Sequence, residues 1–390
     1  MTLAHGHELI AIPGPSPLPA RVMNAAHRAS PDIYGEPLAQ VNLALMAQLK
    51  RLAGTRANLA TYIGNGHAGW EAVAANLLER GDPVLVVTSG HFGRSWADML
   101  ERTGIAVERL DSGNLPPEPD RLRDRLAQDA DGAIRAVMIC QTDTATGTMA
   151  DIPAFRAAMG EHPALLVVDA IASLGCAPMR MDDWGVDVLI SASQKGLMSP
   201  PGLSFVWFSD RAAARGRTGL TTPWWDWHGR ANAGALWQFW GGTPPVQSIF
   251  ALSEALTMIL DEEGLEAVWH RHARLARAVW AAVDAWGANG SGIRLTVADP
   301  ERRAASVTAV TLPGAARLRE WVTRECGVTL GVGIGSDTPE DALRIAHMGH
   351  TGAGTIMGVL GAMQAGLIAL DIPHGPGALE AAAASIAASA

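Results

Sequence analysis

Lys195 ends a short polar segment just past an apolar run, which is an unusual place for a solvated charge. The run Val188–Ile190 is bounded by small or polar residues, as is typical of a buried strand. A lysine at the end of such a strand can lose its proton through desolvation or a nearby cation, and it then becomes an amine nucleophile towards carbonyl groups. Most lysines at strand ends point into water, so a second residue is needed to favour chemistry here.

Asp169 is that second residue. The apolar run Leu165–Val168 predicts another buried strand, and this strand ends on the aspartate. Between Asp169 and Lys195 there is room for one crossover and one more strand. Both side chains can therefore lie at the carboxyl edge of one parallel sheet, where open α/β sheets bind ligands. A lysine and a carboxylate placed there suit pyridoxal 5'-phosphate (PLP), since the lysine forms a Schiff base and the carboxylate keeps the pyridine nitrogen protonated.

The segments around these two residues resemble a known family. They are Val168-Asp169-Ala170, Ser193-Gln194-Lys195-Gly196 and, further upstream, Gly64-Asn65-Gly66-His67. In order and spacing they are similar to the class V aminotransferases of PLP fold type I, and in particular to the alanine/serine–glyoxylate aminotransferase group. The likeness extends from Pro13-Gly14-Pro15 to Arg344, and it implies that Lys195 and Asp169 are the catalytic residues.

The predicted elements fit an α/β fold. Strand and helix patterns alternate from Ala60 to Phe208, which indicates a mainly parallel sheet, and a smaller α/β unit begins near Gly292. We expect a fold type I PLP-dependent transferase with a mobile N-terminal arm (residues 1–20), a large PLP-binding domain with a mainly parallel sheet (21–265) and a small α/β C-terminal domain (266–390). A long helical region over 249–286, broken near Gly264, is expected to carry His270 and His272 on a solvated surface.

Composition excludes several classes of partner. The net charge of −9 argues against nucleic acid, because phosphate-backbone binding needs clustered Lys and Arg. No apolar run reaches transmembrane length and the start lacks a signal-peptide pattern, so we expect a cytoplasmic protein without a membrane partner. The three cysteines have no metal-ligand spacing, and His5 and His7 alone do not make a metal site, so none is predicted.

Asn65, Gly66 and His67 lie where a predicted strand leads into a helix. Glycines and a short polar side chain at a helix start present backbone N–H groups to an anion, and the helix dipole adds to the attraction. A phosphate of the cofactor is the natural occupant. The alternative is a plain turn with an asparagine cap. The family usually has Ser or Thr at the position of Asn65.

The resemblance implies roles for further residues. Phe92 falls where the family stacks an aromatic ring on the pyridine face, Thr144 matches a hydroxyl that bonds the cofactor ring, and Gln194 is expected to contact the cofactor. Gly14 belongs to a segment over the active site. Arg344 matches the family's arginine that binds the substrate carboxylate. A guanidinium can pair with a carboxylate through two hydrogen bonds and therefore binds it better than lysine does. Without the resemblance, Phe92 would be an ordinary core residue, Thr144 a turn residue and Arg344 a member of a surface salt bridge.

Five of the thirteen tryptophans lie between residues 224 and 240. Such a cluster indicates either a subunit interface or a cap over the core. In the resembled family the neighbouring segment contacts the cofactor phosphate of the partner subunit, which implies a homodimer and this role for Thr243. Trp240 stands where the family commonly has Tyr, so the sequence leaves open whether this position contacts the cofactor phosphate of the partner subunit.

The predicted reaction is a ping-pong transamination with small-molecule partners. An amino group passes from a small amino acid such as serine, alanine or aspartate to a 2-oxo acid, glyoxylate or pyruvate. One alternative is an aminotransferase of the pyridoxamine–pyruvate type, whose motif the segment 344–349 also resembles. A second is a lyase or cysteine desulfurase, which needs a mobile reactive cysteine that neither Cys140, Cys176 nor Cys326 provides. A third is a cofactor-binding protein without catalysis.

Overall fold

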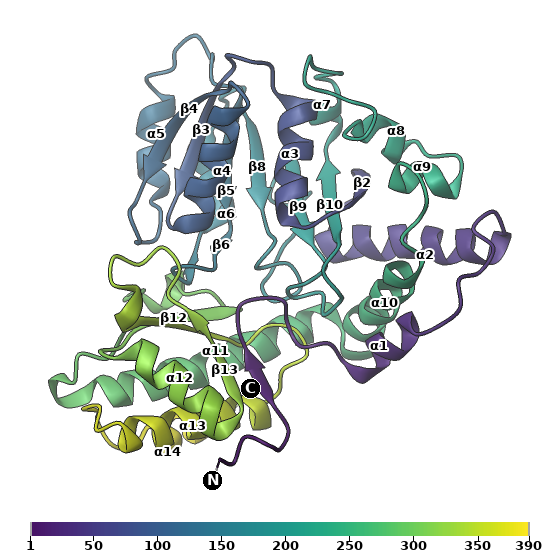
Figure 1. Ribbon diagram of the computed structural model, residues 1–390. Coiled ribbons are helices and arrows are strands. Elements are labelled where there is room, and N and C mark those ends of the chain that lie inside the picture. The colour runs from purple at the N-terminus through teal and green to yellow at the C-terminus, as the bar shows by residue number, and fades with distance from the viewer. Residues whose placement is uncertain (1, 389–390) are drawn as a thin grey trace.

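The computed structural model describes residues 2–388, and its larger part is built on a seven-stranded sheet (Figure 1). In spatial order the strands are β2 (Asn58–Ile63), β10 (Leu203–Phe208), β9 (Val188–Ala192), β8 (Leu165–Asp169), β5 (Ala136–Cys140), β3 (Pro83–Thr88) and β4 (Ala106–Asp111). Neighbours from β9 to β4 run parallel, whereas β10 is antiparallel to both β2 and β9. The predicted mainly parallel sheet is confirmed.

Alternate side chains of these strands enter two separate cores. In β3, Val84 and Val86 pack on one face, and Leu85 and Val87 pack on the other. Helices α3 (Gly66–Leu77) and α4 (His91–Arg102) cover the first face, while α2 (Glu36–Ala53), α5 (Pro119–Leu126), α6 (Ile152–Met159) and α10 (Val246–Thr257) cover the second. The result is a three-layer α/β/α arrangement. Shorter elements complete this part: α1 (Ala20–Ala26), β6 (Thr142–Asp143), β7 (Thr148–Met149), α7 (Asp210–Ala213), α8 (Trp227–Ala231) and α9 (Leu236–Trp240).

A second sheet of five strands lies beside the first part and has its own core. Its spatial order is β1 (Leu9–Ala11), β13 (Val328–Val332), β14 (Ala342–Ala346), β12 (Val307–Thr311) and β11 (Arg294–Leu295). Figure 1 shows α11 (Leu265–Gly287), α12 (Ala315–Cys326), α13 (Ala353–Ala369) and α14 (Ala378–Ala387) gathered with this sheet. Leu343 and Ile345 of β14 face the helices, so Arg344 between them faces the opposite way.

The helical region expected over 249–286 is present, and it is interrupted as predicted. A π-helical segment (Met258–Glu263) follows α10, and Gly264, with φ of +86°, separates it from α11. Short 3₁₀ turns lie at Ala288–Gly290, Pro300–Arg302 and Pro339–Asp341.

The N-terminal arm differs from the prediction. Residues Leu9–Ala11 form β1, which pairs in parallel with β13, so that Leu9 lies opposite Val328. Ala11 is buried in the core of the second sheet. The expected mobile arm over residues 1–20 is therefore wrong for this stretch, because its partner strand lies at the other end of the sequence and no local pattern reveals the pairing.

The prediction for His270 and His272 is wrong for one of the two. His270 is exposed, but His272 is fully buried. Its Nε2 accepts the N–H of Gly349 at 3.0 Å, and its Nδ1 donates to the carbonyl of Val268 at 2.7 Å. Burial lowers the pKa of His272 to about 4, so the ring is neutral and structural.

The carboxyl ends of the parallel strands meet at one edge of the large sheet. Phe92, Thr144 and Lys195 lie in the segments that follow β3, β5 and β9. Asp169 is the last residue of β8, so it lies at the same edge. Between residues 2 and 388, every helix is too short or too polar to span a bilayer.

Candidate active site

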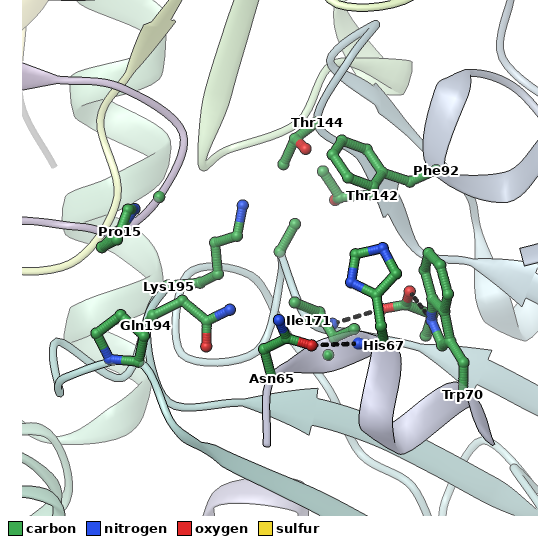
Figure 2. A pocket seen from close by; sticks show the side chains of 15 residues that line it. Pro15, Asn65, His67, Trp70, Phe92, Thr142, Thr144, Ile171, Gln194 and Lys195 are labelled. Atoms are coloured by element: carbon green, nitrogen blue, oxygen red, sulfur yellow. Dashed lines mark hydrogen bonds between the residues drawn. The ribbon is translucent and has the colours of Figure 1, made fainter. Parts of the chain in front are cut away.

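A cavity of about 230 Å³ lies at this edge of the large sheet (Figure 2). Nine residues predicted from the sequence line it: Gly14, Asn65, Gly66, His67, Phe92, Thr144, Asp169, Gln194 and Lys195. The remaining lining residues were not predicted: Pro15, Trp70, Thr142, Ile171, Ala172 and Pro201. The structure thus brings together side chains from segments that are far apart in the sequence.

Asp169 lies at the base of the cavity and is almost fully buried. Its Oδ1 accepts the N–H of Ile171 at 2.7 Å, and its Oδ2 accepts the indole N–H of Trp70 at 2.8 Å. The thiol of Cys140 lies 3.7 Å from the same Oδ2. Burial raises the pKa of Asp169 to about 6, which these donors partly oppose. The carboxyl group is therefore still mainly ionised at neutral pH.

Lys195 extends into the cavity from the loop after β9 (Figure 2). Its Nζ donates a hydrogen bond to the carbonyl of Pro13. Desolvation by burial and the nearby guanidinium of Arg344 lower the pKa of Lys195 to about 8. At neutral pH a fraction of this side chain is therefore the free amine, as a nucleophile requires.

The segment around Gly14 lies against Lys195. Ser16 donates its backbone N–H to the carbonyl of Gln194 at 2.9 Å and its hydroxyl to the carbonyl of Lys195 at 2.7 Å. A Cβ added at Gly14 would come within 2.7 Å of Cδ and Cε of Lys195, and the φ of Gly14 is +99°. Only glycine fits this position without strain.

Asn65 begins helix α3, and its Oδ1 accepts the N–H of His67 at 3.1 Å. The sequence left open an anion site or a plain asparagine cap, and the structure shows the cap at the wall of the cavity. A Cβ at Gly66 would come within 2.3 Å of Cδ1 of Ile171, so the helix start packs closely on the loop after β8. Burial lowers the pKa of His67, whose ring meets the indole of Trp70 edge-on at 4.6 Å.

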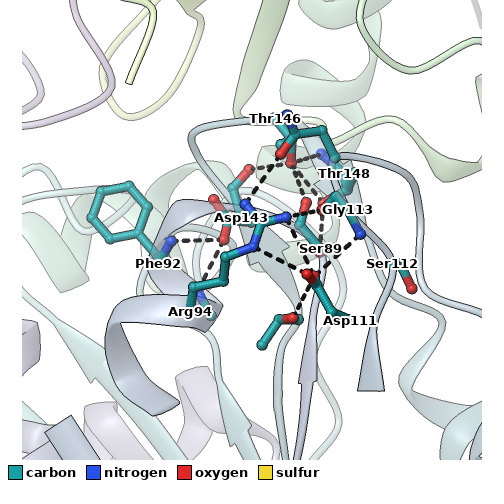
Figure 3. Close-up of polar contacts among 12 residues, drawn as sticks. Ser89, Phe92, Arg94, Asp111, Ser112, Gly113, Asp143, Thr146 and Thr148 are labelled. Atoms are coloured by element: carbon teal, nitrogen blue, oxygen red, sulfur yellow. Dashed lines mark hydrogen bonds and ion pairs between the residues drawn. The ribbon is translucent and has the colours of Figure 1, made fainter. Parts of the chain in front are cut away.

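Asp143 organises the wall opposite Asn65, although the sequence did not single it out as a site residue. The carboxylate is fully buried and accepts the N–H groups of Phe92 at 2.9 Å, Gly93 at 3.0 Å and Ala145 at 2.9 Å (Figure 3). Through these bonds it caps the N-terminus of α4 and fixes the position of Phe92 at the cavity. This role could not be predicted from the sequence, because the residue type alone does not show which N–H groups the carboxylate accepts.

Arg344 does not line the cavity itself but lies beside it. Its Nη1 donates to the carbonyl of Thr144 at 3.0 Å, and its Nε donates to the carbonyl of Val332 at 2.7 Å. The residue is 5% exposed and forms no ion pair within residues 2–388, so the surface salt bridge considered from the sequence is wrong. Burial lowers the pKa of Arg344 to about 10. A buried guanidinium without an anionic partner is suited to an incoming carboxylate.

Thr243 lies outside the cavity of its own chain and is exposed on the surface. Trp240 is fully buried, and its indole N–H donates to Oδ1 of Asn42 at 2.9 Å, so it is not available to a partner subunit. The tryptophan cluster is divided between the core and the surface. Trp227 and Trp240 are core residues, whereas Trp224 and Trp237 are 40% and 51% exposed.

Two buried polar atoms at the cavity have no hydrogen-bond partner among residues 2–388. They are Oε1 of Gln194 and Oγ1 of Thr142. Such atoms cost free energy unless a ligand or water satisfies them. Together with the amine of Lys195, the carboxylate of Asp169 and the start of α3, they fit a polar, anionic, ring-shaped cofactor such as PLP.

The cysteines take no part in lining this cavity. Among the described residues, Cys140 and Cys176 are buried, and Cys326 is half-buried at the end of α12. Burial raises the pKa of Cys176 to about 12, so its thiol is unreactive at neutral pH. The residues 2–388 contain no cluster of His, Cys, Asp and Glu that could hold a metal ion.

The fold and the cavity together define a PLP-dependent transferase of fold type I. Comparison with known proteins gives the family. The profile of the family described as Aminotransferase class-V matches residues 11–333, and the chain belongs to this family. The resemblance found in the sequence is thereby confirmed.

Individual relatives agree with this placement. The chain is 33% identical to a serine–glyoxylate aminotransferase of Methylorubrum extorquens, over 97% of this chain and 96% of that protein. It is 35% identical to an L-aspartate–glyoxylate aminotransferase of Paracoccus denitrificans, over 93% and 91%. The solved structure of pyridoxamine–pyruvate aminotransferase from Mesorhizobium loti is similar with a TM-score of 0.90, at 26% identity over 100% of both chains. The protein is thus a PLP-dependent aminotransferase of the alanine/serine–glyoxylate group.

Proposed function

We propose that this enzyme transfers an amino group from a small amino acid (serine, alanine or aspartate) to glyoxylate or pyruvate. The observation that carries the proposal is the pairing of Lys195 and Asp169 in one cavity, with the unpaired, buried guanidinium of Arg344 beside it. The names of the relatives supply the candidate donors and acceptors.

In this proposal the cofactor is held by residues of the cavity. The N–H groups at the start of α3, with Asn65, Gly66 and His67, receive the phosphate, and Phe92 packs on the ring. Thr144 and Gln194 supply polar contacts, for which the unpaired Oε1 of Gln194 is available. When bound, PLP supplies an electron-poor ring that stabilises negative charge at the substrate α-carbon.

Asp169 and Lys195 have complementary roles in proton handling. Asp169, ionised at neutral pH, pairs with the protonated ring nitrogen of the cofactor. Lys195 Nζ would hold the cofactor covalently, and its amine, when free, would take the proton from the substrate α-carbon. Its lowered pKa, about 8, gives the amine enough free base for both tasks.

Arg344 orients the substrate. It has guanidinium N–H groups that no acceptor among residues 2–388 uses, and these can receive the α-carboxylate in a bidentate pair. Gly14 and the segment around it exclude water above Lys195. No arginine lines the cavity of this chain within the described residues, which favours donors with one carboxylate, serine or alanine, over aspartate.

A panel of amino donors tests this proposal. Each donor is added alone to the PLP-loaded enzyme, and the conversion of the bound cofactor to its aminated form is followed by absorbance. Serine or alanine should convert it rapidly, and glyoxylate or pyruvate should restore the original spectrum. Failure of all amino acids, with conversion by pyridoxamine, would contradict it.

The second candidate is a reaction of the pyridoxamine–pyruvate type. It is favoured by the likeness to that enzyme over the whole of both chains and by the segment 344–349, which resembles its motif. Such an enzyme would release its pyridoxal after each turnover. Purified protein that retains yellow PLP through gel filtration contradicts this candidate.

We also propose a cytoplasmic homodimer in which Thr243 contacts the cofactor phosphate of the partner subunit. The exposed Thr243 and the exposed Trp224 and Trp237 support this arrangement. Two separate hydrophobic cores support the division into domains of residues 21–265 and 266–390, with Leu9–Ala11 of the N-terminal segment packed on the second domain. Light scattering of the purified protein tests the dimer, and cell fractionation tests the location.

A further inference from the structure

Trp70 contacts the side chain on which the cofactor ring depends. Its indole N–H donates to Oδ2 of Asp169 at 2.8 Å, within a buried environment. The other donors to this carboxylate are the N–H of Ile171 on Oδ1 and the more distant thiol of Cys140 on Oδ2. Trp70 is therefore the strongest side-chain donor that Asp169 receives.

The indole is fixed in this position from several sides. Trp70 is 2% exposed and stacks on Trp96, with ring centroids 5.7 Å apart and an interplanar angle of 14°. Gly69 holds helix α3 close to the sheet, because a Cβ there would come within 2.5 Å of Cγ2 of Ile190. The N–H of Trp70 thus points at Asp169 before any ligand arrives.

The charged groups around Asp169 do little to favour its ionised form in the cofactor-free chain. Asp143 from the wall and the thiol of Cys140 from β5 face it, and Asp143 opposes ionisation. Lys195 is the nearby cation, but its Nζ donates a hydrogen bond to the carbonyl of Pro13 and not to Asp169. Burial and Asp143 raise the pKa of Asp169, whereas the hydrogen bonds from Ile171 and Trp70 lower it.

We propose that Trp70 is a positioning residue that holds Asp169 in place and in its ionised form, ready to pair with the ring nitrogen of PLP. This inference rests on the proposed role of Asp169. It assigns to α3 a second task besides presenting its N-terminus to the phosphate.

Trp70→Phe and Trp96→Phe are a matched pair of variants. Both remove an indole from the same buried stack, but the N–H of Trp96 has no hydrogen-bond partner in the described part of the chain, so only Trp70→Phe loses a bond. The measurement is the dissociation constant of PLP from the cofactor-free protein as a function of pH, followed by absorbance. An analogue of PLP with carbon in place of the ring nitrogen is titrated in parallel, since it has the same phosphate but cannot pair with Asp169.

Trp70→Phe should bind PLP about tenfold more weakly than the wild type at pH 5 and nearly as tightly at pH 7.5, because losing a hydrogen bond to the charged form of Asp169 raises the pKa of this group, which is mostly ionised in both proteins at pH 7.5. The pH below which PLP affinity falls should move up by about one unit. Trp96→Phe should match the wild type, and the analogue should bind all three proteins alike. Equal losses in both variants, or an equal loss with the analogue, would overturn the inference.

Two further outcomes are decisive. If the affinity of the wild type for PLP does not fall on acidification, the proposed pairing of Asp169 with the ring nitrogen is refuted. The role of Trp70 is then refuted as well, because it depends on that pairing. If the wild type shows that fall and Trp70→Phe does not shift it, only the role of Trp70 is refuted. Should Trp70→Phe fail to fold, Trp70→Leu, which also lacks the N–H, is measured in its place.

Discussion

The hydroxyl of Ser16 donates to the backbone carbonyl of Lys195 at 2.7 Å, across a sequence separation of 179 residues. This bond, with that from the Ser16 N–H to Gln194, fixes the N-terminal segment over the reactive lysine. The shape of the cavity above Lys195 therefore depends on residues that lie outside the large sheet. The following predictions test this arrangement and the roles of the residues beneath it.

Lys195→Ala should abolish covalent attachment of PLP and lower turnover by at least about 10³-fold, because the amine is both attachment point and proton carrier. The sequence contains only two lysines, Lys50 and Lys195, which makes a direct assignment possible. Borohydride reduction of the PLP-loaded wild type followed by peptide mapping should place the label on Lys195. Label on Lys50, or a Lys195→Ala enzyme with normal turnover, would refute the role.

Gly14→Ala should disturb Lys195, because the added methyl would meet its side chain and alanine is strained at a φ of +99°. We expect a cost of about 1–3 kcal/mol, seen as weaker PLP binding and slower turnover. Gly6→Ala is the control, since nothing lies within 4 Å of a Cβ at that position of the same segment. The prediction fails if the two variants bind PLP equally well.

Arg344→Lys should raise the KM for both amino acid and oxo acid by roughly 10- to 100-fold, with a smaller change in kcat. A lysine cannot make a bidentate pair with the carboxylate while also reaching the carbonyls of Thr144 and Val332. Arg294→Lys, at an exposed position lining a neighbouring pocket, is the control. Unchanged KM values in Arg344→Lys would place the carboxylate elsewhere.

Asp169→Asn should make the cofactor-free chain more stable at neutral pH while weakening PLP binding. The folded-state pKa of Asp169 is raised to about 6 from an ordinary value of 3.8. The stability that this group contributes is therefore fully present below pH 4 and lost as pH rises through 6.

Removing the buried charge should recover up to about 3 kcal/mol at pH 7.5. Urea unfolding of the cofactor-free wild type and variant, at pH 4 and pH 7.5, measures this. The variant should gain stability only at the higher pH, and an equal difference at both values would show that the carboxyl group does not titrate as described.

The sequence predicted those parts of the fold that local patterns determine. Apolar runs located the strand that ends at Asp169 and the strand that precedes Lys195, and a glycine located the break at Gly264. The pairing of β1 with β13 was missed, because three apolar residues next to a proline-rich segment carry no sign of a distant partner. The burial of His272 was missed for the same reason. Its ring bonds the carbonyl of Val268 on its own helix and the N–H of Gly349 on a distant segment.

The candidate site was predicted to the extent that its residues occur in family motifs. Nine of the predicted residues line the cavity, and Arg344 lies beside it. Trp70 and Asp143 were missed because their function lies in which atoms they contact, not in their type. An indole donating to Asp169 and a carboxylate capping α4 become visible only when the packing of α3 and α4 is known.

The position of β1 has a consequence for the biosynthesis of the enzyme. Leu9–Ala11 are made long before their partner strand, β13. The segment that covers Lys195 thus cannot be anchored on the second sheet until β13 has been made, although the large sheet has already emerged by then. Maturation of the cofactor site is therefore a late step of folding, and a nascent chain stalled before Val328 would leave its reactive lysine uncovered.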